Sequence, residues 1–264
     1  MDRYTVTAYI RCYRDPGLVL KCASHVKWAD ELVIADNSGD NSVKDIVSQI
    51  AHPNIKYFAT DIVDWRLRVN SLKDKMSSDY ILMIDTDEFY SEAAGEEILA
   101  VLADKQNVNE GYIVPSESFL FGQYYQKGAD QLRLFMRDKF YFNNNSVHEM
   151  PKVPGKVGKL NNGYDHFNSP TFANQLTKPF TYAMADAKML TDEQLNKKRV
   201  DGYSSVKIKL HFFKILLKLI WRSRGFFFSK NMNFMHLWLR YVDMLVITAN
   251  DIGPTEEIRI REQK

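Results

Sequence analysis

The feature that most constrains this chain is a regular alternation of short apolar segments and longer segments with helical spacing, between Arg3 and about Pro115. Apolar and β-branched runs bounded by turn residues predict strands at TVTAYI, ELVIAD, IKYFA and YILMID. The spacing of apolar residues between these runs predicts helices at 18–26, 43–50 and 65–76. Strands that alternate with helices in this way are typical of an α/β fold with a parallel sheet and crossover helices.

Polar residues follow three of the predicted strands. Arg11–Asp15 follow the first strand, the turn DNSGD begins at Asp36 after the second, and DTDE begins at Asp85 after the fourth. Open α/β sheets bind ligands outside the carboxyl ends of their strands, and the ends of parallel strands share one edge. The sequence therefore predicts that these residues gather on one rim and form a binding site there.

The acids of DTDE suggest what that site binds. A D-x-D sequence in a surface loop is usually only a solvated turn, but Asp85 and Asp87 follow a strand whose composition indicates burial. Two carboxylates separated by one residue can share a hard divalent cation whose other ligands are water and diphosphate oxygens. We therefore expect a Mg²⁺ or Mn²⁺ site for a phosphate-bearing substrate.

The turn at Asp36 offers a complementary feature. Its carboxylate could accept a hydrogen bond from the N–H of a pyrimidine base or from a ribose hydroxyl, although a plain strand-to-helix turn needs the same residue types. Neither G-x-G-x-x-G nor G-x-x-x-x-G-K-[ST] occurs in the sequence. Dinucleotide-binding and P-loop classes therefore lack their main support.

Composition and charge exclude other classes. The chain has 264 residues, 45% of them hydrophobic, and a formal net charge of +2, so it can bury a core and offers no general field for nucleic acid. Cys12 and Cys22 form neither a disulfide framework nor a metal-ligand spacing, which predicts buried thiols in a reducing compartment. With no secretion signal and no run of about 18 uncharged apolar residues, we expect a cytoplasmic protein without a spanning helix.

Together these segments resemble glycosyltransferase family 2, whose members are inverting enzymes with the GT-A fold. The resemblance rests on TVTAYIRCYRD, LVIADNSGDNS, WRLRVN and YILMIDTDE, which match the order and spacing of the family's nucleotide-sugar half. The chain departs from the pattern after the first strand, where the family has Asn-Glu and this chain has Tyr13-Arg14-Asp15-Pro16. Asp15 is the candidate to replace the family's Asn-Glu in contacts with the base of the donor.

The next part of the chain is similar to the branch that contains bacterial lipopolysaccharide core β-glucosyltransferases. The similar segment is LRLFMRDKFYFNNNSVHEMPKVPGKVGKLNNGYDHF, which contains a V-H-E tripeptide. Members of the branch have a His at the start of a helix in the position of His166. The glycines typical of their C-terminal part are replaced by bulky residues in GFFFSKNMNF, so the acceptor side can differ.

The resemblance implies a role for each matching residue. Asp36 corresponds to the base-binding aspartate, and Arg68, with Arg66 as an alternative, to the arginine on the diphosphate side. Asp85 and Asp87 correspond to the D-x-D acids, with Asp87 the more direct metal ligand. The remaining assignments are Glu149 as the general base, His166 as a further metal ligand, and Arg133 as a donor-binding residue.

Several of these assignments leave alternatives open. Glu149 could instead pair with Arg133 or Arg137, and His166 could start a helix without binding a metal. Arg133 alternates with leucines on a presumed strand, where it could face the acceptor, the diphosphate or solvent. Glu88 is expected to orient its neighbours or to bond to nearby backbone.

The C-terminal third carries a different signal. VKIKLHFFKILLKLIW at 206–221 predicts a basic amphipathic helix that either lies on an anionic membrane surface or packs on the catalytic domain. We expect a GT-A domain at 1–200, with a nucleotide-sugar half at 1–115 and an acceptor half at 116–200, and a helical extension at 201–264. Attachment to the cytoplasmic face of a membrane would suit a lipid-linked acceptor.

The predicted function is metal-dependent, inverting transfer of a hexose from a nucleotide-sugar, most simply a UDP-sugar, to a glycan or lipid-linked saccharide. In such a transfer a single base takes the proton of the attacking hydroxyl. A sugar-phosphate nucleotidyltransferase is the first alternative, although its Gly-rich loop with a following Arg and Lys is missing. The second alternative is a catalytically silent binding protein that keeps the fold.

Overall fold

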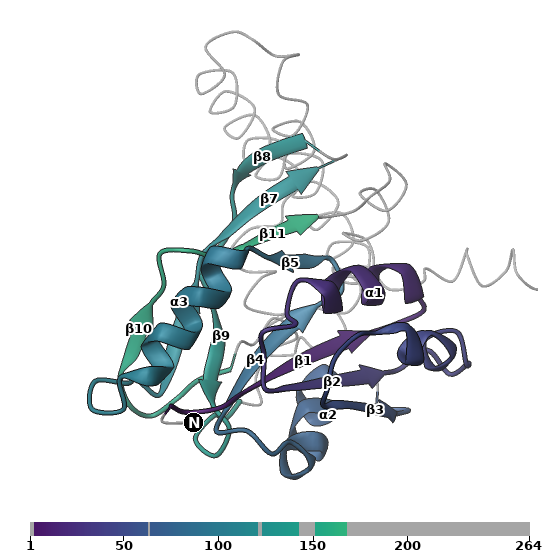
Figure 1. Ribbon diagram of the computed structural model, residues 1–264, viewed down its shortest axis with the longest axis horizontal. Coiled ribbons are helices and arrows are strands. Elements are labelled where there is room, and N and C mark those ends of the chain that lie inside the picture. The colour runs from purple at the N-terminus through teal and green to yellow at the C-terminus, as the bar shows by residue number, and fades with distance from the viewer. Residues whose placement is uncertain (1–2, 63, 121–122, 143–150, 168–264) are drawn as a thin grey trace, which may run out of the picture. The chain divides into compact units, whose positions relative to one another are not determined.

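Two β-sheets organise the part of the chain that the computed structural model describes, residues 3–62, 64–120, 123–142 and 151–167 (Figure 1). The larger sheet contains β1 (Val6–Cys12), β2 (Glu31–Asp36), β3 (Ile55–Ala59), β4 (Tyr80–Asp85), β6 (Gly111–Val114), β9 (Gln131–Met136) and β10 (Val157–Lys159). The order of these seven strands is β10-β6-β9-β4-β1-β2-β3. The smaller sheet has the order β5-β11-β7-β8, with β5 (Glu88–Tyr90), β7 (Ser116–Leu120), β8 (Gln123–Lys127) and β11 (Tyr164–Phe167).

The predicted strands are confirmed in type and nearly in extent. ELVIAD, IKYFA and YILMID are β2, β3 and β4 with the expected bounds, and TVTAYI lies mostly within β1. β1 pairs in parallel with both β2 and β4, and β2 pairs in parallel with β3. The parallel α/β arrangement expected from the alternation is therefore present on this side of the sheet.

The helices differ from their predicted bounds at the ends. The described residues contain α1 (Pro16–Ser24), α2 (Trp65–Leu72) and α3 (Glu92–Ala103). The first starts earlier than expected because Asp15 caps it, accepting a hydrogen bond from the Leu18 N–H, and proline suits the first helical turn. The segment predicted as a helix at 43–50 is a 3₁₀ helix, η1 (Lys44–Gln49), which has no side-chain cap, and α2 continues as the 3₁₀ turn η2 (Lys73–Lys75).

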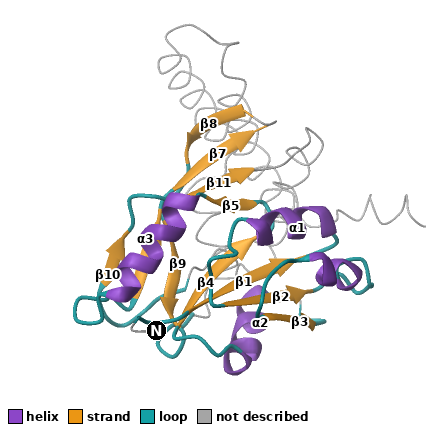
Figure 2. Cartoon of the chain, in the orientation of Figure 1, coloured by secondary structure: helices purple, strands orange, loops and turns teal. Residues whose placement is uncertain are grey.

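Helices cover both faces of the larger sheet. Alternate residues of β1 enter two separate core clusters: Ala8 and Ile10 pack with residues of α1 and α3, whereas Tyr9 packs with residues of α2. This follows from the two-residue period of a strand, which sends successive side chains to opposite faces. Figure 2 shows α1 and α3 in front of the strands.

Two features of the described region were not expected. β9 pairs antiparallel with both β4 and β6, so the sheet is mixed rather than wholly parallel. The helix start expected at His166 is wrong, because this residue lies in β11, whose backbone pairs with β7 on one side and β5 on the other. That double pairing uses the backbone groups that a helix would need for itself.

Some predictions fall outside the described residues. They concern Glu149, the helix at 206–221, the extension at 201–264 and the domain boundary at 200. Within the described residues no helix is long and apolar enough to cross a membrane. The two cysteines are both described, and both thiols are free and buried, as predicted.

Candidate active site

The carboxyl ends of β1, β2 and β4 bring the predicted rim residues together. In the strand register Arg11 lies beside Asp85, and Cys12 lies beside Asp36. These pairings place the ends of three neighbouring parallel strands at one edge of the sheet. The convergence that the sequence predicted is therefore present.

Asp85 is held by two arginines from neighbouring strands. Arg11 forms an ion pair with it through two bonds, one from Nε to Oδ1 and one from Nη2 to Oδ2 at 2.7 Å. Arg133 Nη2 lies 3.3 Å from the same Oδ2. Burial alone would raise the pKa of Asp85, but these guanidinium groups hold it well below its ordinary value. Asp85 is therefore an ionised carboxylate whose two oxygens are already engaged.

Glu88 is fully buried beside this cluster. Its carboxylate forms an ion pair with Arg133 and accepts a hydrogen bond from the backbone N–H of Asp85 at 3.1 Å. The expectation that Glu88 bonds to nearby backbone is confirmed. Burial raises the pKa of Glu88 to about 7, with the charge of Asp85 acting in the same direction and that of Arg133 opposing it.

Arg133 lies at the centre of this arrangement on β9. It is only 3% exposed, so the alternative that it faces solvent is wrong. Besides the two carboxylates, its Nε approaches the hydroxyl of Tyr164 at 3.4 Å. Its Nη1 is one of the buried side-chain atoms in the described region that have no hydrogen-bond partner. A buried guanidinium N–H without a partner is costly, so this atom is a candidate donor to a ligand.

Asp87 and His166 form a second pair at the rim. Asp87 Oδ2 lies 3.6 Å from Nε2 of His166, and the Phe167 N–H donates to the Asp87 carbonyl at 2.9 Å. Burial lowers the pKa of His166, but the neighbouring carboxylates, Asp87 foremost, outweigh burial and raise it. Among the described residues no group of three His, Cys, Asp or Glu side chains is arranged to hold a metal ion.

Asp36 is buried and already bonded within the protein. It is 2% exposed, its Oδ1 accepts from the backbone N–H of Ser38 at 2.8 Å and from the Ser38 hydroxyl, and its Oδ2 accepts from the Tyr57 hydroxyl at 2.8 Å. The Ser38 hydroxyl in turn accepts from the backbone N–H of Arg14 at 2.7 Å. Asp36 therefore fixes the loop that follows β1.

That loop has an unusual backbone and an exposed aromatic ring. Arg14 has a φ of +51°, in the left-handed region that residues other than glycine seldom adopt. Tyr13 is 60% exposed, and the Arg14 guanidinium lies 5.2 Å from its ring centre. Asp15, the candidate substitute for a donor-binding residue, uses its carboxylate to cap α1.

The two arginines of α2 are in different environments. Arg66 pairs with Asp64, its Nη2 donating to Oδ2 at 2.6 Å. Arg68 is 6% exposed, and its Nε donates to the Ile62 carbonyl at 2.9 Å. Burial is the main cause that lowers the pKa of Arg68, and Arg11 acts on it in the same direction. Arg68 is therefore close enough to Arg11 and Asp36 of the rim to interact with their charges.

The sequence placed Arg11 on the rim but did not predict its pairing with Asp85, and it gave no role to Tyr57. The Arg11–Asp85 pairing could have been found, because aligning the ends of adjacent parallel strands already places the two residues next to each other. The Arg11 guanidinium also lies 4.6 Å from the ring centre of Trp65 at the start of α2. Tyr57 gave no comparable signal, since its bond to Asp36 depends on the pairing of β2 with β3.

Comparison with known proteins identifies the fold. No family model matches the sequence. S. aureus TarS 1–349 in complex with UDP-GlcNAc is similar at a TM-score of 0.51 and 12% identity, over 92% of this chain and 89% of that chain. The same TarS segment in complex with UDP gives a TM-score of 0.50 and 13% identity over the same shares. The 4-diphosphocytidyl-2C-methyl-D-erythritol synthase from Anaerococcus prevotii DSM 20548 has a TM-score of 0.46 and 15% identity, over 65% of this chain and 92% of that chain.

At such identities the likeness to TarS concerns the fold alone. The predicted fold, an α/β sheet of the GT-A, Rossmann-like kind, is confirmed by that likeness and by the strand order. This chain spans 44% of the length of a longer TarS chain, which it matches at 10% identity and a TM-score of 0.49. The lipopolysaccharide core branch remains a prediction from the sequence motifs.

Proposed function

We propose that this chain is a metal-dependent, inverting family 2 glycosyltransferase that moves a hexose from a nucleotide-sugar to a glycan or lipid-linked saccharide. The observation that carries the proposal is the meeting of Arg11, Asp36 and the Asp85–Asp87 acids at the carboxyl ends of three parallel strands. Open α/β sheets bind ligands at such an edge. TarS structures of the same fold contain UDP-GlcNAc or UDP, which supports a UDP-sugar as the donor.

The loop after β1 is suited to the nucleoside part of the donor. The exposed ring of Tyr13 offers a flat surface on which a base can stack. Asp36 can accept a base N–H only if the Tyr57 hydroxyl gives up its bond to Oδ2. Asp36 can bind the base and still hold the loop, because Ser38 donates to its other oxygen, Oδ1. That bond keeps the loop in place while Oδ2 exchanges the Tyr57 hydroxyl for the base.

Asp87 and His166 are the residues that fit a divalent cation. A carboxylate and an imidazole whose nearest atoms are 3.6 Å apart can share one ion, with diphosphate oxygens and water as the other ligands. Asp85 fits less well, because both of its oxygens are engaged by arginines. When bound, Mn²⁺ or Mg²⁺ would neutralise the charge that grows on the departing diphosphate.

The protein's own cations complete the donor side. Arg68 lies near the rim cluster. The Nη1 of Arg133, which has no hydrogen-bond partner among the described residues, can donate a hydrogen bond to an oxygen of the nucleotide-sugar. In this proposal Arg11 keeps Asp85 ionised and in place, so that Asp85 acts as a positioning residue. Glu149 takes the proton of the attacking hydroxyl, a role that rests on the V-H-E motif of the sequence and concerns a residue outside the described ones.

The acceptor side of the proposal rests on the sequence resemblance. A glycan or lipid-linked saccharide at the cytoplasmic face of a membrane fits both the lipopolysaccharide core branch and the basic amphipathic pattern at 206–221. With a single base and no covalent sugar intermediate, the anomeric configuration would invert. The stereochemistry of the product, read by NMR, tests that part directly.

A donor panel tests the proposed function. Purified wild-type protein is mixed with nucleotide-sugars and Mn²⁺ or Mg²⁺, and release of the nucleoside diphosphate is measured, alongside Asp87→Ala, Glu149→Gln and the exposed α3 control Glu96→Gln. We expect release by the wild type and by Glu96→Gln, and loss in the other two, with donor binding retained in Glu149→Gln. Release that survives chelation and both substitutions would overturn the mechanism.

The same panel separates the alternatives. A nucleotidyltransferase would consume a nucleoside triphosphate and a sugar phosphate and release pyrophosphate. A silent binding protein would bind the donor without turnover, and Asp87→Ala would leave its biological role intact. Each of these results would replace the glycosyltransferase proposal.

A further inference from the structure

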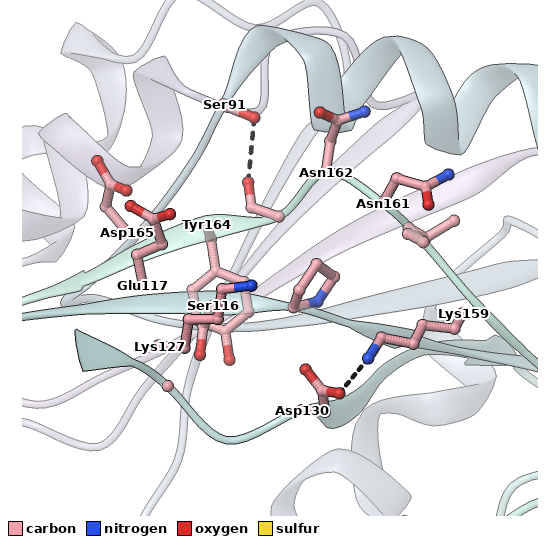
Figure 3. A pocket seen from close by; sticks show the side chains of 14 residues that line it. Ser91, Ser116, Glu117, Lys127, Asp130, Lys159, Asn161, Asn162, Tyr164 and Asp165 are labelled. Carbon is pink, nitrogen blue, oxygen red and sulfur yellow. Dashed lines mark hydrogen bonds and ion pairs between the residues drawn. The ribbon is translucent and has the colours of Figure 1, made fainter.

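A cavity lies at the smaller sheet, and none of the rim residues lines it. Its volume is about 780 Å³, and it is bounded by the starts of β7 and β11, the end of β8 and the loop between β10 and β11 (Figure 3). A volume of this size is within the range of small-molecule sites. The charged side chains among its lining residues are Glu117, Lys127, Asp130, Lys159 and Asp165.

Two carboxylates lie side by side in this cavity without a hydrogen-bond or ion-pair partner in the described part of the chain. Glu117 and Asp165 are paired in register on the parallel strands β7 and β11, and Figure 3 shows their carboxylates close together. Like charges in this relation destabilise a sheet. Neither carboxylate has a hydrogen bond or ion pair with the described residues, and Lys127, in register with Glu117 on β8, has none either.

The rest of the cavity wall is fixed by bonds within the protein. Lys159 pairs with Asp130 across the opening. Asn161 and Asn162 donate both backbone and side-chain N–H groups to Glu97 of α3 at 2.8 to 3.1 Å. A cavity with a fixed wall and unpaired polar groups is preorganised for a ligand, because little ordering remains to be done on binding.

The unpaired groups indicate which ligand fits. A metal ion is disfavoured, because cations already lie beside these acids: Lys159 pairs with Asp130, and Lys127 is in register with Glu117. An anion is disfavoured as well, because the cavity has Glu117, Asp130 and Asp165 against only Lys127 and Lys159. Ionised carboxylates accept hydrogen bonds and donate none, so they match a ligand rich in hydroxyl groups.

We propose that this cavity is a saccharide-binding site, in which hydroxyl groups of one or two sugar units donate to Glu117 and Asp165. Its further role, which rests on the proposed glycosyltransferase function, is to anchor a part of the acceptor glycan that does not react. Asp165 lines the cavity, whereas the next residue of β11, His166, does not, and neither does Asp87. The cavity is thus separate from the Asp87–His166 pair although it involves the same strand.

Tyr164 links the cavity to the donor rim. It lines the cavity, and its hydroxyl lies 3.4 Å from Nε of Arg133, which pairs with Glu88 and approaches Asp85. A sugar held here would lie within one side chain of the network that positions the first D-x-D acid. The anchor would therefore lower the KM of a long acceptor without contributing a group to the reaction.

Direct binding is the first test. Saturation-transfer NMR on the full chain uses trisaccharides of glucose, galactose and N-acetylglucosamine, with wild type, Asp165→Asn, Glu117→Arg and the exposed α3 control Glu96→Gln. We expect at least one trisaccharide to bind the wild type and Glu96→Gln alike, and about tenfold weaker binding by the two cavity variants. Binding by none, or equal binding by all four proteins, would overturn the site.

Folding and function are separated by the choice of variants. Glu117→Arg puts a cation beside Asp165 but also opposite Lys127, so the two effects oppose each other and its thermal stability should stay close to that of the wild type while its sugar binding falls. Donor hydrolysis without acceptor should stay unchanged in both cavity variants, whereas KM for a long acceptor should rise and KM for a monosaccharide acceptor should not. Sugar binding without any turnover would refute the proposed glycosyltransferase function and support the saccharide-binding cavity. Turnover without sugar binding would support the glycosyltransferase function and refute the saccharide-binding cavity.

Discussion

Arg11 and Asp85 lie side by side on adjacent parallel strands and are joined by a two-bonded ion pair, with 2.7 Å between Nη2 and Oδ2. The first acid of the D-x-D motif is thus neutralised by a residue from the first strand of the same sheet, with Arg133 approaching from the other side. The second acid, Asp87, has His166 as its ion-pair neighbour instead. The two acids of one motif therefore have different surroundings and should respond differently to substitution.

Removal of Arg11 should destabilise the fold. In Arg11→Gln the carboxylate of Asp85 keeps only Arg133, and loss of one partner of a largely buried ion pair costs about 3 kcal/mol. Urea denaturation should show this loss in the free energy of unfolding. Arg14→Gln is the matched control: that arginine is exposed, its nearest acid atom is 3.8 Å away, and its loss should cost less than about 1 kcal/mol. Equal losses in the two variants would contradict the role given to Arg11.

The two D-x-D acids should differ in their effect on the metal. We expect Asp87→Asn and His166→Gln to raise the Mn²⁺ concentration for half-maximal binding by about tenfold or more, because each removes a ligand. Asp85→Asn should lower stability and leave that concentration nearly unchanged. Water proton relaxation of Mn²⁺ in the presence of UDP measures binding independently of turnover. A shift in Asp85→Asn as large as in Asp87→Asn would show that both acids hold the ion.

The strands and the rim could be predicted because their signals are local. YILMID is apolar over the length of a buried strand and ends in acids, and parallel strands must end at a common edge. The start of α1 at Pro16 could also have been predicted, since Asp15 is a typical N-cap residue and proline is typical of the first helical turn. Periodicity, turn residues and caps are all encoded within a few positions of one another.

The pairings inside the site could not be predicted, since they join distant parts of the chain. Arg133 meets Glu88 across a separation of 45 residues, because β9 inserts antiparallel beside β4. Nothing near Arg133 in the sequence signals that insertion, so the sequence alone could not decide whether the Arg133 side chain is buried or faces solvent. The strand that contains His166 was missed for the same reason, since its partners β5 and β7 precede it by many residues.

Glu31 should make stability depend on pH in the acid range. It is fully buried at the start of β2, and burial alone would raise its pKa. Bonds from Lys56, from the Thr7 hydroxyl at 2.6 Å and from Ser77 outweigh burial and lower the pKa below its ordinary value of 4.5. A carboxylate whose folded-state pKa is lowered contributes stability above its unfolded pKa and loses that contribution as pH falls through the folded value.

Glu31→Gln should therefore cost about 2 kcal/mol at neutral pH and progressively less below about pH 4.5. The difference in unfolding free energy between the two proteins isolates this residue, because all other carboxylates are common to both. Urea denaturation at a series of pH values from neutral to acid supplies that difference. A constant difference across the series would mean that the charge of Glu31 contributes nothing and that only its shape matters.

Two glycines should respond in opposite directions to the same substitution. A methyl group at Gly163 would overlap the carbonyl oxygen of Pro115, which is backbone and cannot rotate away, so Gly163→Ala should lower the free energy of unfolding by about 2 kcal/mol or more. Gly17 lies in α1 with nothing within 4 Å of such a methyl, so Gly17→Ala should raise it by about 0.5 kcal/mol, through the lower entropy of the unfolded chain. Thermal unfolding of both variants tests the contrast. A Gly163→Ala protein as stable as the wild type would mean that the start of β11 can move away from Pro115, which would also reshape the cavity wall.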